Sequence, residues 1–211
     1  IRRLEFMLDV PEIPAFTYLV LFAFSGFLLG ALALRFVFPL LSLEGRSFWV
    51  ILSAPVRLRK LYWIKLGLGV IVLLSLGLLV SVFSNIPFVR LTHNSPVLPV
   101  LGAVTTFWLS LAMVSLNLGL GGFFANYQEK NPIRIASSQG ATLTFLVNLF
   151  LLVVLIGVMA IPVMQYFEAV ALAIPFDADV FVVPTVVFSI LALLSGVLGT
   201  VVGDRSLRRD F

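Results

Sequence analysis

Residues 66–86 read LGLGVIVLLSLGLLVSVFSNI, a stretch that contains no charged side chain. A helix of about 20 apolar residues crosses the ~30 Å hydrocarbon layer of a bilayer. Similar apolar windows cover residues 13–37, where the apolar part ends near Arg35, and residues 97–125, 142–164 and 180–203. None of them alternates apolar and polar residues as a membrane β-strand would, and helices satisfy their own backbone polar groups in lipid. The sequence therefore predicts an all-α, polytopic membrane bundle of about five transmembrane helices.

The composition of the whole chain agrees with this interpretation. Of the 211 residues, 61% are apolar and 11% are charged, and the mean hydropathy is +1.14. Soluble domains carry roughly 45–50% apolar and about 25% charged residues, so a soluble enzyme, a disordered linker and a fibrous repeat are excluded. There is no cysteine, and His93 is the single histidine, so we predict no disulfide, metal site, catalytic residue or cofactor. Because the sequence opens on Ile1, we expect it to be part of a longer polypeptide or trimmed at its start.

Basic residues predict the orientation of the five spans. Counting loops alternately, eleven of the fourteen Lys and Arg residues fall on one side, and only Arg2, Arg3 and Arg90 fall on the other. Basic residues concentrate in cytoplasmic loops, so the N-terminal end is predicted outside and the C-terminus in the cytoplasm. The pI near 9.9 therefore reflects topology, and no nucleic-acid partner is expected.

Between the spans, the apolar pieces at residues 47–53 and 167–176 are too short to cross a bilayer. Residues 39–65 form a cytoplasmic connection in which Glu44 and Gly45 make a polar break, an aromatic-rich stretch follows, and Ser53 and Pro55 signal the start of another helix. One interpretation is an interfacial helix held by anionic membrane lipid; the other is a docking element for a cytoplasmic partner. On the outer side, residues 167–178 are predicted to be interfacial or re-entrant.

Two short motifs in the cytoplasmic loops carry a family resemblance. Leu43-Glu44-Gly45-Arg46-Ser47-Phe48-Trp49, followed by Ser53-Ala54-Pro55, resembles a motif of bacterial ABC-2-type permeases of the ABC exporter group. Asn131-Pro132, followed by Ile135-Ala136-Ser137-Ser138, resembles a second motif of that group. The order of the elements is also similar to a six-span permease half that has lost its first span. Its cytoplasmic coupling helix would occupy residues 39–65, and its outer re-entrant hairpin would occupy residues 167–178.

The resemblance implies a permease subunit of an ABC-type exporter in the bacterial inner membrane, moving a hydrophobic or lipid-like substrate. The chain has no G-x-x-x-x-G-K-[ST] motif, so the expectation is a non-enzymatic subunit driven by a separate cytoplasmic ATPase, beside a further permease chain or a second copy. The ATPase-docking residues implied are Glu44, Gly45, Arg46, Phe48, Trp49, Arg57, Arg59 and Lys60. The second cytoplasmic loop would contribute Asn131, Pro132 and Arg134.

Small and polar residues within the spans suggest how the helices pack. Small residues at spacings of four allow close helix approach in lipid, and they occur at Gly26, Gly30, Ser195, Gly199 and Gly203. Asn117 and Asn148 are the strongest candidates for hydrogen bonds between helices. No ionisable residue lies in the middle of a span, which argues against an ion-coupled carrier. This absence fits equally well with the alternative function, a non-catalytic membrane anchor or scaffold subunit of a larger complex.

Overall fold

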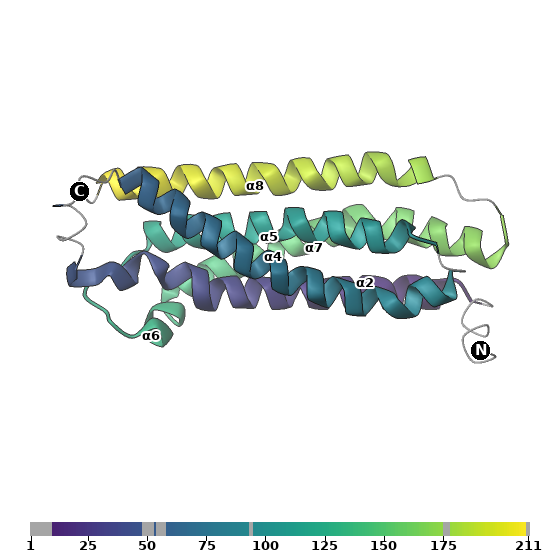
Figure 1. Cartoon of the computed structure of the whole chain (residues 1–211), viewed down its shortest axis with the longest axis horizontal. Coiled ribbons are helices and arrows are strands. Elements are labelled where there is room, and N and C mark those ends of the chain that lie inside the picture. The colour runs from purple at the N-terminus through teal and green to yellow at the C-terminus, as the bar shows by residue number, and fades with distance from the viewer. Residues whose placement is uncertain (1–9, 48–52, 54–57, 93–94, 175–177, 210–211) are drawn as a thin grey trace.

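The computed structural model describes residues 10–47, 53, 58–92, 95–174 and 178–209, and these residues form helices and turns with no strand. The long helices are α2 (Glu12–Leu32), α4 (Leu58–Leu91), α5 (Val97–Phe123), α7 (Gln139–Ala171) and α8 (Val182–Arg209). Five helical segments are long and apolar enough to cross a membrane, and Figure 1 shows them side by side along one axis. The predicted fold class, an all-α bundle of about five spanning helices, is confirmed.

Two helices, α4 and α7, extend at both ends beyond the windows marked by the sequence. α4 has 34 residues and α7 has 33, whereas about 20 suffice to cross the hydrocarbon layer. α7 continues through Ala171, so Phe167 is a fully buried residue of this helix. A short 3₁₀ turn, η5 (Ala178–Phe181), then leads into α8. Residues 167–171 of the predicted re-entrant segment thus belong to α7.

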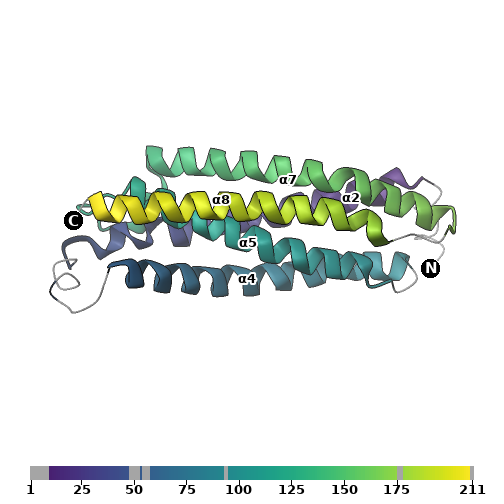
Figure 2. The same cartoon turned by 90° about the horizontal axis from the view of Figure 1, so that it is seen from above.

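The central helix is α5. It packs against α8 and α4, while α2 packs against α7. Figure 2 shows α4 and α7 on opposite edges of the bundle with the other helices between them. Among the described residues, α5 carries more buried polar side chains than any other helix, among them Thr105, Ser110 and Asn117, because its surroundings are other helices instead of lipid.

Glycines bring α5 and α8 into backbone contact. A Cβ atom on Gly119 would overlap the carbonyl of Gly199, and one on Gly199 would lie 2.5 Å from the carbonyl oxygen of Ser115. Close backbone approach of this kind is what small residues permit in membrane helices. Of the other sequence-marked positions, Gly26 faces Leu152, Gly30 faces Met113 and Asn148, and Gly203 faces the ring of Tyr62. The hydroxyl of Ser195 donates to the carbonyl of Ala192 in its own helix.

Asn117 and Asn148, the two asparagines that the sequence marked, do not bridge helices. Asn117 Nδ2 donates to the carbonyl oxygen of Met113 at 2.7 Å, within α5. Asn148 is 2% exposed, and neither of its amide atoms has a hydrogen-bond partner among the described residues. The expectation of hydrogen bonds between helices is therefore wrong for both residues in this structure, because Asn117 finds an acceptor one turn back and Asn148 faces small and apolar groups.

Candidate functional site at the basic end

One end of the bundle gathers most of the described basic residues, and it is called the basic end below. There α2 ends, α4 begins, α5 ends, α7 begins and α8 ends (Figure 1). The cationic residues there whose burial the structure describes are Arg35, Arg59, Lys60, Lys65, Lys130, Arg134 and Arg205, and the backbones of Arg46, Arg208 and Arg209 lie at the same end. Arg90 lies at the other end, with Glu12, Glu168 and Asp179. The division matches the loop-by-loop count made from the sequence.

The chain leaves α2 through short helical turns at residues 33–47, which are called the corner below. The helix passes through a π turn, η2 (Ala33–Val37), and two 3₁₀ turns, η3 (Phe38–Leu40) and η4 (Ser42–Ser47). Pro39 lies within η3 and removes a backbone donor there. Glu44, Gly45 and Arg46 lie in η4, and Arg59 and Lys60 lie exposed in the first turn of α4. Phe48, Trp49 and Arg57 lie outside the described residues.

An ion pair ties this corner to α4. Lys65 Nζ donates to Glu44 Oε1 and, at 2.6 Å, to the carbonyl oxygen of Leu40. The Lys65 side chain is only 11% exposed and that of Glu44 is 28% exposed. Removing water from these charges is costly unless they remain paired, so the pair fixes the start of α4 against the end of α2. The sequence analysis counted Lys65 among the basic residues and did not assign it to the site. The sequence did contain a signal for this pair, because Glu44 and Lys65 lie near the two ends of the connection between the first two spans.

The connection from α5 to α6 (Pro132–Ala136) rests on the same corner. The backbone N–H of Asn126 donates to Ser42 Oγ at 3.1 Å, and the Ser42 side chain is buried. Gly45 has a φ of +47°, which L side chains rarely adopt, and a Cβ there would lie 3.3 Å from the Tyr127 carbonyl oxygen. Glycine is thus required at this turn by its conformation as well as by the neighbouring loop.

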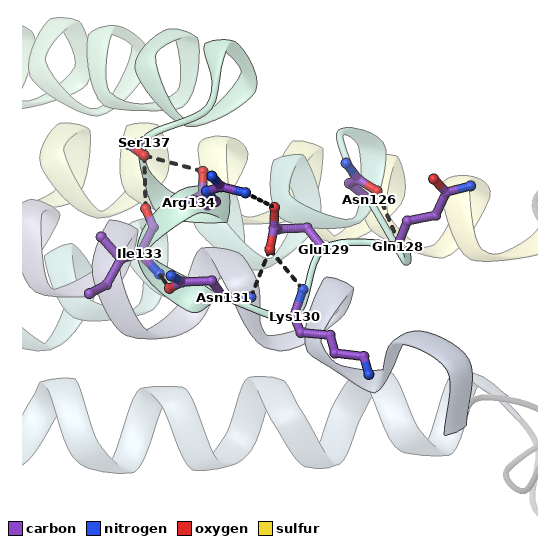
Figure 3. Close-up of polar contacts among 8 residues, drawn as sticks. All are labelled: Asn126, Gln128, Glu129, Lys130, Asn131, Ile133, Arg134 and Ser137. Carbon is purple, nitrogen blue, oxygen red and sulfur yellow. Dashed lines mark hydrogen bonds and ion pairs between the residues drawn. The ribbon is translucent and has the colours of Figure 1, made fainter.

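The second predicted loop is held by its own polar contacts (Figure 3). Asn131 Oδ1 accepts from the Ile133 N–H at 3.0 Å and caps α6, with Pro132 at the first helical position. Glu129 Oε1 accepts from the N–H groups of Lys130 and Asn131, both at 3.0 Å, and Glu129 Oε2 lies 3.5 Å from Arg134 Nη1. Principally through the Asn131 N–H, these contacts lower the pKa of Glu129 below its usual range. Glu129 is the organising residue of this loop, and the sequence analysis missed it.

The corner and the second loop therefore form one block. Phe38 packs with Ile135 and Ala141, the last of these in the first turn of α7. On the α8 side, Ser206 Oγ donates to the Gly122 carbonyl oxygen at 2.6 Å. Backbone and side-chain contacts thus connect the basic ends of all five long helices. Within the described part of the chain, no three His, Asp or Glu residues cluster as metal ligands would.

Comparison with known proteins gives one result. Residues 1–210 match the protein family described as "Putative ATP-binding cassette". No curated protein and no solved structure matches the chain. The match links the chain to ATP-binding cassette transporters, and the five apolar helices indicate a membrane protein.

The match corrects three predictions. The family is described by ATP binding, so the assignment to ABC-2-type permeases is wrong, and so is the exporter-permease function drawn from it. The description implies an ATP site, which overturns the expectation of a transport subunit without one. The alternative of a non-catalytic scaffold gains no support from the match. The error arose because two short loop motifs were used to identify a family, while the match covers nearly the whole chain.

Proposed function

Because the chain belongs to the family described as an ATP-binding cassette, we propose that it works in a membrane within an ATP-binding cassette transport system and that its basic end contacts an ATP-hydrolysing subunit. The basic end would face the cytoplasm, since Lys and Arg concentrate on that side of membrane proteins. The N-terminal end would then lie outside, and a bacterial inner membrane would be the setting.

The observation that carries the proposal is the Lys65 contact with both Glu44 and Leu40. It makes α4 follow any displacement of the corner at the end of α2. The Asn126–Ser42 hydrogen bond adds the end of α5 to the same unit. A displacement of the corner on partner binding would consequently move α2, α4 and the end of α5 together.

The exposed groups suggest the chemistry of the contact. Leu43 is 43% exposed, and the Arg134 side chain is 77% exposed on the neighbouring loop. Lys60 and Lys130 are also exposed. An exposed apolar side chain at an end that also carries exposed cations fits a partner surface with an apolar pocket and an acidic rim. In this proposal Glu44 fixes the corner to α4 through its ion pair with Lys65, and Gly45 allows the positive φ of the turn. The remaining sequence-marked docking residues are Arg46, Phe48, Trp49, Arg57 and Arg59.

Single-cysteine crosslinking in native membranes tests the proposal, since the chain has no cysteine of its own. Leu43→Cys and Lys130→Cys should each react through a short thiol-to-amine crosslinker with the ATP-hydrolysing subunit. Leu172→Cys is the matched control, because Leu172 is 69% exposed at the opposite end. Crosslinks from Leu172→Cys alone, or from none of the three variants, would refute the proposed contact.

A further inference from the structure

A small notch opens between the start of α4 and the end of α8. Its cavity volume is about 140 Å³, and its lining includes Arg59, Tyr62, Trp63, Asp204 and Arg205. In Figure 1, α4 leaves the side of α8 at the basic end and crosses toward α2 at the other end. The notch therefore lies where the two helices meet.

The charged side chains that line the notch have a net positive charge, since two are arginines and one is an aspartate. Arg59 Nε lies 3.9 Å from Asp204 Oδ1, which is a loose ion pair, and the Arg59 side chain is 65% exposed. Arg205 is exposed on the next position of α8. Two guanidinium groups and one carboxylate thus belong to the lining of the notch. An anion with several oxygen atoms would match this set, since guanidinium groups bind phosphate through more than one N–H.

A buried hydroxyl belongs to the same lining. Tyr62 is 1% exposed, its ring packs on Gly203, and its Oη has no hydrogen-bond partner among the described residues. A buried hydroxyl usually finds a partner, and an oxygen atom of a ligand in the notch would supply one. Beside it Trp63 is 49% exposed, and an indole at the edge of a span is typical of the membrane interface.

Beyond the notch the two helices present apolar side chains. Leu68 and Ile71 of α4 are 59% and 67% exposed, and Leu198 of α8 is 64% exposed. A bound molecule with its anionic group in the notch would continue along hydrocarbon-compatible surface. A free nucleotide or inorganic phosphate would leave that surface without a contact.

We propose that this notch binds the phosphate headgroup of an anionic phospholipid, whose acyl chains lie against α4 and α8. Basic pockets between spanning helices bind such headgroups in membrane proteins. Arg59 and Arg205 hold the phosphate, the Tyr62 hydroxyl donates to one of its oxygen atoms, and Trp63 marks the depth of the glycerol region. The site shares Arg59 with the sequence-marked docking residues, but lipid binding in the notch does not depend on a contact with the ATP-hydrolysing subunit.

Quenching of Trp63 fluorescence by lipids with brominated acyl chains tests the proposal. The full chain carries Trp49→Phe and Trp108→Phe so that Trp63 reports alone, and it is reconstituted with phosphatidylcholine and brominated phosphatidylglycerol, or with the labels exchanged. We expect a preference for phosphatidylglycerol of about fivefold. In Arg59→Gln/Arg205→Gln the preference should fall to none, whereas Lys130→Gln/Arg134→Gln, which removes two exposed cations elsewhere at the basic end, should retain it.

Two results would overturn the proposal. One is that the two arginines give no lipid preference, seen either as equal quenching by both lipids or as an unchanged preference in Arg59→Gln/Arg205→Gln. The other is loss of the preference when millimolar inorganic phosphate or ATP is added at constant ionic strength, because the notch would then be a site for soluble phosphate. Neither result bears on crosslinking from Leu43→Cys, so this proposal and the proposed function fail independently.

Discussion

Lys65, near the start of α4, is bonded to Glu44, 21 residues earlier in the chain, and to the carbonyl oxygen of Leu40. This relationship closes the corner between two spanning helices, and it places a mostly buried charge beside the membrane-spanning part of α4. The ion pair therefore adds an electrostatic contact to the apolar packing and hydrogen bonds that hold the corner.

The stability of the corner should depend on Lys65. Lys65→Met leaves Glu44 unpaired and the Leu40 carbonyl without its donor, so we expect the free energy of unfolding to fall by about 2–3 kcal/mol. Thermal unfolding of the purified chain in detergent measures this, and Lys60→Met at an exposed position is the control. Adding Glu44→Gln to Lys65→Met should recover part of the loss. Equal stability of the two lysine variants would show that the ion pair contributes nothing.

The contact between α5 and α8 should not tolerate a methyl group. In Gly119→Ala the added Cβ overlaps the Gly199 backbone, so the helices must separate. We expect a loss of about 1–3 kcal/mol or more, as for an overpacked core. Gly157→Ala on α7 is the matched control, because a Cβ there has nothing within 4 Å, and it should be neutral or gain up to ~1 kcal/mol of helix propensity. Similar melting of both variants would contradict the backbone contact.

Removing the buried amide of α7 should not destabilise the bundle. Asn148→Leu eliminates two buried polar atoms that have no hydrogen-bond partner among the described residues, so stability should hold or rise by about 1 kcal/mol. The matched change is Thr144→Val, four residues earlier on α7, which loses the hydroxyl bond to the Gly140 carbonyl and should be mildly destabilising. A large loss in Asn148→Leu would mean that the amide has a partner in the folded protein.

The order of the second loop should depend on the ionisation of Glu129. The ionised carboxylate accepts the two backbone bonds, and these lower its pKa in the folded chain. The contribution to loop stability is therefore fully present above the ordinary pKa of glutamate, and it is lost as the pH falls through the lowered pKa. Amide proton shifts of Lys130 and Asn131 should titrate together in that acidic range. Glu129→Gln should abolish this titration; its persistence would assign it to another group.

The proposed orientation predicts which residues a membrane-impermeant maleimide reaches in intact cells. Leu172→Cys should be labelled directly, whereas Lys130→Cys should be labelled only after the membrane is permeabilised. The chain contains no competing thiol. The reverse pattern would place the basic end outside and remove the basis for an ATP-hydrolysing partner there.

The sequence by itself determined the number of spanning helices and the end at which their basic residues gather. Charge-free stretches of membrane length leave few alternatives, because unpaired backbone groups are too costly in lipid. The faces on which the helices pack were decided only by the tertiary structure. Residues facing lipid and residues facing another helix are both apolar in a membrane, so Leu68 and Leu73 look alike in sequence although one is 59% exposed and the other 1%.

The same reason applies to the candidate site. Glu44, Gly45, Asn131 and Pro132 stood out as polar or turn-forming residues between apolar windows, and the structure brings their two loops together. Three contacts became visible only in the structure: Lys65 with Glu44, Glu129 with the Asn131 N–H, and Tyr62 with Gly203. Each of these contacts joins groups whose spatial relation is set by how the helices cross or how a loop turns, and that geometry follows from the packing of whole helices.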